Sequence, residues 1–131
     1  MRPEGRGMQK RILLVDDDEP LATILTYALR TEGYQVDWVN DGMKALSYLG
    51  VNRPDLIIMD IMMPNLNGLE TMRITRQNEL MEGVVILALS AKRLTDREIR
   101  ELENLCDAYM PKPFGVQHLL GTVSQLLSSP V

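Results

Sequence analysis

The chain has 131 residues, of which 45% are hydrophobic and 24% are charged, a length and composition typical of one folded domain and not of a disordered segment. Its formal net charge of -4 gives no electrostatic reason to expect nucleic acid or an anionic membrane as a direct partner. The single cysteine excludes an intramolecular disulfide, and no apolar run is long enough to cross a bilayer, so we expect a cytoplasmic protein.

Residues 1–9 contain two glycines and a proline without apolar periodicity, and we expect them to form a flexible leader or an expression remnant. The folded domain is then expected over residues 10–128, with residues 129–131 as a tail. From Arg11 onward, short apolar runs alternate with segments of helical periodicity. The runs that we expect to form strands are Ile12–Val15, Tyr34–Val39, Leu56–Met59, Val84–Leu89 and Ala108–Met110.

The segments between these runs predict helices, because their apolar residues recur at intervals of three and four. We expect the helices at Pro20–Thr31, at Gly42–Leu49, from near Gly68 towards Glu79, from a capping box at Thr95 to Glu98 onward, and at Val116–Leu127. Gly33 is suited to end the first helix, and Asn40 or Asp41 to cap the second. Five strands that alternate with helices predict an α/β protein with a (βα)5 parallel sheet.

Charged and polar side chains follow four of the expected strands. Asp16 and Asp17 follow the first strand, Asp60 the third, Ser90 the fourth and Lys112 the fifth. Right-handed crossovers bring the carboxyl ends of parallel strands to one edge of the sheet, where ligands bind in open α/β folds. Gathered carboxylates raise the cost of ionising one another, and Mg2+ is the usual remedy. Acids, a hydroxyl and an ammonium beside Mg2+ are the parts that phosphoryl transfer requires.

Four stretches carry a resemblance to a known family, at residues 12–18, 54–68, 87–91 and 109–114. In order, spacing and placement at strand ends they resemble the receiver (CheY-like) domain of two-component response regulators. The resemblance covers nearly the whole chain and implies a flavodoxin-like, doubly wound sheet with strand order 2-1-3-4-5. It also implies a protein that phosphorylates and dephosphorylates only itself, and that is therefore not an enzyme with an external product.

By this resemblance, Asp60 accepts a phosphoryl group from the phosphohistidine of a sensor histidine kinase or a histidine phosphotransfer protein. The side chains of Asp17 and Asp60 bind Mg2+ directly. The backbone carbonyl of Met62 is a further ligand, and Asp16 binds the ion through a water molecule. The resemblance therefore implies that one magnesium ion lies beside the phosphoacceptor.

The same resemblance assigns roles to residues of the last two strands. Ser90 hydrogen-bonds a phosphoryl oxygen, and Lys112 pairs with the phosphoryl group. The peptide bond between Lys112 and Pro113 is cis, which proline tolerates. Tyr109 is the aromatic switch, and the face made by the fourth helix, the fifth strand and the fifth helix then changes shape for partner binding or for a homodimer.

Two other interpretations stay open. A phosphatase of the haloacid dehalogenase type would use Asp16 as its nucleophile, since Asp16-x-Asp18 resembles that motif, although Pro20 replaces the expected Thr or Val. A degenerate receiver would bind partners without being phosphorylated. The Leu-Cys pair at residues 105–106 also departs from the Gly-Ala pair of many receivers, and Asn104 is a candidate for the left-handed turn there.

Overall fold

The structure is a computed structural model that describes residues 9–63, 66–91 and 93–128. The expected leader, apart from its last residue, and the expected tail lie outside the described residues. The elements are β1 (Arg11–Val15), α2 (Glu19–Thr31), β2 (Gln35–Val39), α3 (Gly42–Leu49), β3 (Leu56–Asp60), α4 (Gly68–Gln77), a 3-10 turn η1 (Glu79–Met81), β4 (Val85–Ser90), α5 (Asp96–Leu105), β5 (Ala108–Pro111) and α6 (Val116–Leu127). The predicted strands and helices are therefore confirmed, with ends shifted by one or two residues.

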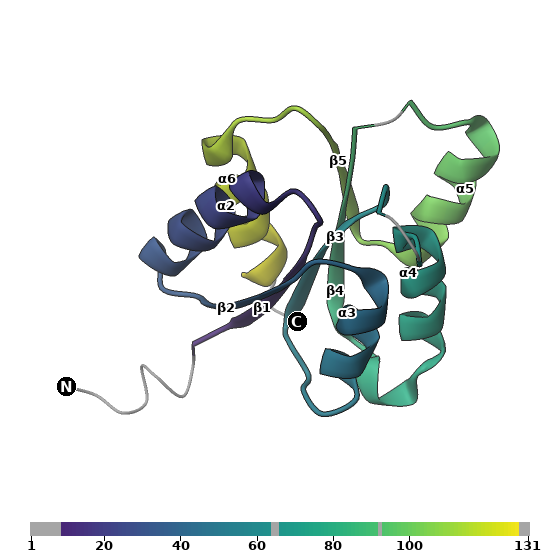
Figure 1. Ribbon diagram of the computed structural model, residues 1–131, viewed down its shortest axis with the longest axis horizontal. Helices are drawn as coiled ribbons and strands as arrows, with labels where there is room; N and C mark the ends of the chain where they lie inside the picture. The colour runs from purple at the N-terminus through teal and green to yellow at the C-terminus, as the bar shows by residue number, and fades with distance from the viewer. Residues whose placement is uncertain (1–8, 64–65, 92, 129–131) are drawn as a thin grey trace.

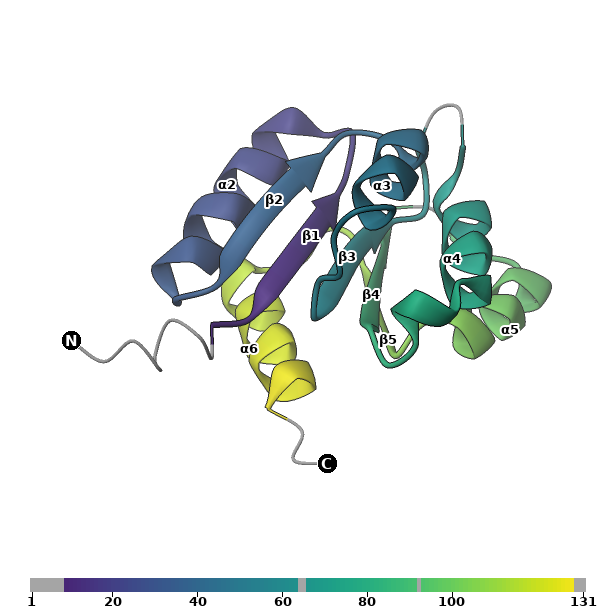
Figure 2. The same cartoon turned by 90° about the horizontal axis from the view of Figure 1, so that it is seen from below.

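The strands form one parallel sheet in the order β2-β1-β3-β4-β5, which confirms the predicted fold and strand order. Helices α2 and α6 cover one face of the sheet, and α3, α4 and α5 cover the other (Figure 1). Figure 2 shows the strands side by side, with β2 at one edge and β5 at the other. Within the described residues, no helix combines the length and the apolar character needed to span a membrane.

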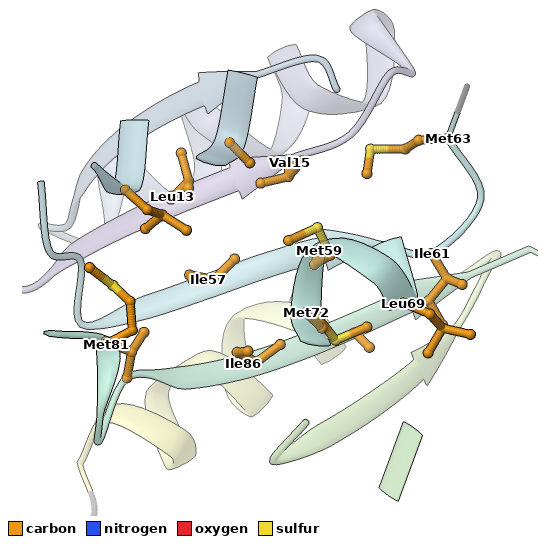
Figure 3. Packing of buried hydrophobic residues seen from close by; sticks show 14 of the residues in the cluster. Leu13, Val15, Ile57, Met59, Ile61, Met63, Leu69, Met72, Met81 and Ile86 are labelled. Carbon is orange, nitrogen blue, oxygen red and sulfur yellow. The ribbon is translucent and has the colours of Figure 1, made fainter. Parts of the chain in front are cut away.

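The core consists of one apolar cluster on each face of the sheet. Successive side chains of a strand point to opposite faces, so Ile57 and Met59 of β3 pack with α4, whereas Leu56 and Ile58 pack towards α2 and α6. Figure 3 shows Met72 of α4 lying over the first of these faces. Because helices cover both faces, every residue of β3 is buried, and the carboxyl end of this strand is held firmly.

The helix ends follow the residues that the sequence offers for them. The side chain of Asp18 caps α2 by accepting a hydrogen bond from the backbone N–H of Leu21 at 3.1 Å. Thr95 and Glu98 form the predicted capping box at the start of α5. Gly33 lies just after α2 with a φ of 100°, a backbone conformation that favours glycine. Asp18 therefore caps a helix, whereas Asp16 and Asp17, the two acids before it, do not.

The end of α5 differs from the expectation of a left-handed turn at Asn104. Asn104 lies inside the helix, which continues to Leu105, and Cys106 after it is extended, with φ -112° and ψ 162°. The guanidinium of Arg76, on α4, donates to the carbonyl of Leu105 at 2.8 Å and to the carboxylate of Asp107 at 3.0 Å. A side chain from a neighbouring helix thus satisfies the helix end, and a left-handed residue is not needed.

Gly68 begins α4 at a close approach to the carboxyl end of β3. A Cβ at this position would lie against the carbonyl oxygen of Asp60 and 2.7 Å from the Cα of Ile61, both of them backbone atoms. We expect Gly68→Ala to lower the free energy of unfolding by about 2 kcal/mol, because α4 must move away from the strand. Urea denaturation of the purified variant measures this loss.

The matched control is Gly121→Ala, in the interior of α6. In the described part of the chain, a Cβ built at Gly121 meets no atom within 4 Å apart from its chain neighbours and the backbone of its own helix. The same substitution is therefore expected to leave stability unchanged or to raise it by up to about 1 kcal/mol, the usual helix preference for alanine. Equal losses in the two variants would contradict the close approach at Gly68.

Candidate functional site

The polar residues singled out in the sequence gather at the carboxyl edge of the sheet. Asp16 directly follows β1, Asp60 is the last residue of β3 and Ser90 the last of β4, while Lys112 directly follows β5. Asp16, Asp60 and Ser90 are 0%, 3% and 1% exposed, whereas Asp17 is exposed. Parallel pairing of β1, β3 and β4 in register is what brings these distant positions together.

The amine of Lys112 joins two buried carboxylates. Its Nζ lies 2.9 Å from Oδ2 of Asp16 and 3.4 Å from Oδ2 of Asp60. Burial works to lower the pKa of the Lys112 amine, but the hydrogen bond and charge of Asp16, together with Asp60, raise it above its usual value. The lysine therefore stays charged at neutral pH and compensates part of the negative charge of the two acids.

Asp60 carries the clearest sign that this compensation is incomplete. Its Oδ1 accepts a hydrogen bond from the backbone N–H of Met62 at 3.1 Å. Burial and the neighbouring charge of Asp16 nevertheless raise the pKa of Asp60 to about 6, against the opposing effects of Lys112 and the Met62 N–H. The ionised pair Asp16 and Asp60 therefore benefits from additional positive charge.

The acids also suit a metal ion. One carboxylate oxygen each from Asp16, Asp17 and Asp60 lies within 4.8 Å of the other two. Carboxylate oxygens are the ligands that Mg2+ prefers, and an exposed Asp17 leaves an open side for water ligands and for a substrate. The donor set, its spacing and the raised pKa of Asp60 together fit a hard divalent cation.

Two other predicted residues lie at the margin of this cluster. The side chain of Met62 is about half exposed, and its backbone N–H is bonded to Asp60. Tyr109 is 40% exposed and lines a hollow together with Ser90 and Lys112. The predicted cis peptide between Lys112 and Pro113 is present. The structure thus brings the three acids and Lys112 together and places Tyr109 beside them, outside the acid cluster.

Sequence reasoning missed Trp38, the fourth residue of β2. Its indole Nε1–H donates a hydrogen bond to the backbone carbonyl of Asp16 at 2.8 Å. The contact joins β2 to the residue that directly follows β1, and no local pattern in the sequence indicates it. Knowing how β1 and β2 pair would have indicated the contact, because Leu14 pairs with Trp38 and lies two residues before Asp16.

The raised pKa of Asp60 predicts how the metal-free protein responds to pH. Because this pKa rises from 3.8 to about 6 on folding, ionising the group costs stability, and the cost is absent below about pH 4 and complete above about pH 6. In a chelator, we therefore expect Asp60→Asn to match the parent near pH 4. Above pH 6 the variant should be about 2 to 3 kcal/mol more stable.

Urea denaturation of both proteins across this pH range measures the difference. The prediction would be contradicted by a stability difference that stays constant between pH 4 and pH 7. Adding Mg2+ at pH 7 should reduce the difference in stability between Asp60→Asn and the parent, because a bound cation stabilises the ionised acids of the parent protein.

Comparison with known proteins identifies a single family. The family model of the response regulator receiver domain matches residues 12–124. The DNA-binding response regulator MtrA of Mycobacterium leprae (strain TN) is 40% identical over 116 residues, which are 88% of this chain and 50% of MtrA. Response regulator MprA of Mycobacterium sp. (strain KMS) is 38% identical over 120 residues, 92% of this chain and 51% of MprA. The chain spans about half the length of these curated relatives.

Solved structures agree with this match. The receiver domain of the sensor histidine kinase PA1611 from Pseudomonas aeruginosa PAO1, described with a magnesium ion coordinated in the active site cleft, superposes with a TM-score of 0.83 at 32% identity, over 92% of this chain and 99% of that one. The response regulator TrrA from Thermotoga maritima, in complex with Mg2+ and BeF, gives 0.81 at 32% identity, over 91% and 100%. The chain belongs to the response regulator receiver domains of two-component signal transduction.

Proposed function

We propose that residues 10–128 form a receiver domain in which Asp60 takes a phosphoryl group from the phosphohistidine of a sensor histidine kinase or a histidine phosphotransfer protein. The observation that carries this proposal is the buried carboxylate of Asp60, held beside Lys112 and within reach of Asp16 and Asp17 at the ligand-binding edge of the sheet. The relatives named above are response regulators, which supports the same class of phosphodonor.

In the transfer step, a carboxylate oxygen of Asp60 forms a bond to phosphorus while the bond from phosphorus to the histidine nitrogen breaks, and the imidazole leaves. With a pKa of about 6, Asp60 is mostly ionised at neutral pH and available as the nucleophile. The Lys112 ammonium, 3.4 Å from Asp60, is placed to donate to the phosphoryl oxygens, and the Ser90 hydroxyl gives a second donor. The chain itself therefore supplies the nucleophile, through Asp60, and the donors that position and stabilise the phosphoryl group, through Lys112 and Ser90.

A magnesium ion completes this arrangement. We assign it to the carboxylates of Asp17 and Asp60, to the backbone carbonyl of Met62 and, through water, to Asp16, a set that the clustered acid oxygens support. When bound, the ion neutralises charge on the acids and on the phosphoryl oxygens. The description of magnesium in the active site cleft of the PA1611 receiver domain supports this assignment.

The incoming partner has a surface available next to the acids. A hollow lined by Asp18, Leu21, Lys112 and Phe114 opens beside the Lys112 ammonium. We propose that a protein presenting a phosphohistidine docks over this hollow, because its lining includes the lysine that contacts Asp60. We expect this encounter in the cytoplasm, without direct nucleic acid or membrane contact by this domain, in keeping with its acidic net charge of -4.

The response to phosphorylation is assigned to Tyr109 and the face formed by α5, β5 and α6. Tyr109 is partly exposed and shares a hollow with Ser90 and Lys112, so a shift of the Ser90 hydroxyl towards a phosphoryl group opens space for the ring. Turning the ring inward changes the surface of this face, and a partner or a second copy of the chain reads that change.

Two alternatives are not favoured. A phosphatase that attacks through Asp16 is not favoured, because the receiver family model matches residues 12–124 and because Lys112 lies closer to Oδ2 of Asp16, at 2.9 Å, than to Oδ2 of Asp60, at 3.4 Å. A degenerate receiver lacks one or more of the groups found here. We propose that the domain catalyses only its own phosphorylation and dephosphorylation.

The test is incubation of the chain with phosphoramidate, in Mg2+ and in a chelator, followed by intact-mass measurement and borohydride mapping of the acyl phosphate. The proposal expects one phosphoryl group per chain, on Asp60, in Mg2+ only. A phosphoryl group on Asp16 would favour the phosphatase, and no incorporation would support the degenerate receiver. Either of these results overturns the proposed function.

A further inference from the structure

Trp38 contacts the acid-bearing loop at the point where the sheet ends. The last paired residues of β1 and β2 are Val15 and Val39, and the backbone N–H of Asp16 still donates to the carbonyl of Val39 at 3.2 Å. The carbonyl of Asp16 then receives its hydrogen bond from the indole of Trp38, at 2.8 Å. At Asp16, the first residue of the loop, the backbone carbonyl is therefore hydrogen-bonded by a side chain and not by the backbone of β2.

This carbonyl belongs to the peptide group that links Asp16 to Asp17. A change of ψ at Asp16 that is not compensated at Asp17 would move the Cα of Asp17 and turn its carboxylate relative to that of Asp16. The side chain of Asp16 is already fixed by the Asp18 N–H and by Lys112. The exposed carboxylate of Asp17 depends on the backbone for its direction, and the indole holds that backbone.

The strand that carries Trp38 is tied to α2. Trp38 lines a hollow together with Ala22, Thr26 and Tyr27 of α2, and it is 36% exposed. Arg30 of the same helix donates from its guanidinium to the backbone carbonyl of Val36 at 2.8 Å, which ties α2 to β2. The indole is therefore presented by a strand that is tethered to the neighbouring helix, which limits how far the donor can move.

We propose that Trp38 is a positioning residue for the metal site: its indole N–H fixes the peptide between Asp16 and Asp17 so that both carboxylates face Asp60. The inference rests on the proposed function, since it concerns the ion that assists phosphoryl transfer. Trp38 contacts neither the ion nor the phosphodonor, and it acts only through the backbone of Asp16. Its loss should therefore weaken Mg2+ binding and leave the chemistry intact once the ion is bound.

The test exploits the fact that the chain contains one tryptophan. Production in a tryptophan auxotroph supplied with benzothienylalanine replaces the indole N–H of Trp38 by sulfur and keeps the ring. Calorimetric titration with Mg2+ should show a dissociation constant raised about fivefold to tenfold, because the free energy of ordering the loop must then come from ion binding. The rate of phosphorylation by phosphoramidate at saturating Mg2+ should stay within about twofold of the parent, since the loss lies in binding.

Trp38→Phe, which also lacks the donor, is measured in the same titration. It tests the proposal independently if the protein containing benzothienylalanine folds poorly. Tyr27→Phe, on the other wall of the hollow, is the control and should bind Mg2+ like the parent. In the parent protein, the indole N–H gives one NMR signal, and slow exchange of this proton with solvent should accompany the hydrogen bond.

The outcomes separate the two proposals. A parent protein without affinity for Mg2+ would overturn the proposed function. A parent that binds Mg2+ no more tightly than the analogue protein and Trp38→Phe would overturn the role of Trp38 alone. Equal losses of affinity and of saturated rate would also overturn it, because they indicate general damage to the site.

Discussion

Replacing Asp60 with asparagine is expected to lower phosphoryl incorporation from phosphoramidate by at least about a hundredfold. The amide is not a competent nucleophile, and Asp16 is a poor substitute because it is 0% exposed and lies closer to Lys112 than Asp60 does, at 2.9 Å against 3.4 Å. The variant should fold well, because the amide oxygen can still accept the Met62 N–H and one buried negative charge is gone. A time course of intact-mass spectra in Mg2+ measures the loss.

Asp18→Asn is the matched control for this change. It makes the same substitution two residues from Asp16, and asparagine caps a helix about as well as the aspartate that now accepts the Leu21 N–H. Its rate should stay within about twofold of the parent, since Asp18 lies outside the acid cluster. The opposite pattern, with Asp18→Asn inactive and Asp60→Asn active, is the one that a phosphatase built on Asp16 would give.

The positions of the acids were predictable from the sequence because they depend on local signals. A buried run such as Leu56–Met59 indicates a strand, and the acid that follows it must lie at the carboxyl edge of a parallel sheet. The capping box at Thr95 and the glycine after α2 mark helix ends in the same local way. These features need no knowledge of which strand lies beside which.

Contacts between remote elements could not be predicted in this way. The guanidinium of Arg76 ends α5 by reaching across from α4, and its place in the sequence resembles that of any surface arginine. Trp38 reaches Asp16 only through the register of β1 with β2. The contact of the Lys112 amine with both Asp16 and Asp60 likewise depends on side-chain distances that the sequence does not contain. Sequence pattern gives the edge where the site lies, and packing gives the partners within it.

Lys112→Met is expected to have the largest effect on the stability of the metal-free protein, a loss of about 3 kcal/mol at pH 7. The substitution leaves the buried carboxylates of Asp16 and Asp60 without the amine that contacts both. The pKa of Asp60, already raised to about 6 by burial and Asp16, should rise further, because Lys112 now lowers it. Urea denaturation in a chelator measures the loss.

Lys44→Met is the matched control, because the same change on the exposed surface of α3 should alter stability by no more than about 0.5 kcal/mol.

Mg2+ gives a second, independent check on Lys112. Without the ammonium, the acid cluster attracts a cation more strongly, so Lys112→Met should bind Mg2+ more tightly than the parent and recover much of its stability in Mg2+. Phosphorylation at saturating Mg2+ should nevertheless remain slow, because the ion does not replace a donor aimed at the phosphoryl oxygens. A Lys112→Met protein as stable as the Lys44→Met control in chelator would contradict the assignment of this amine to the buried acids.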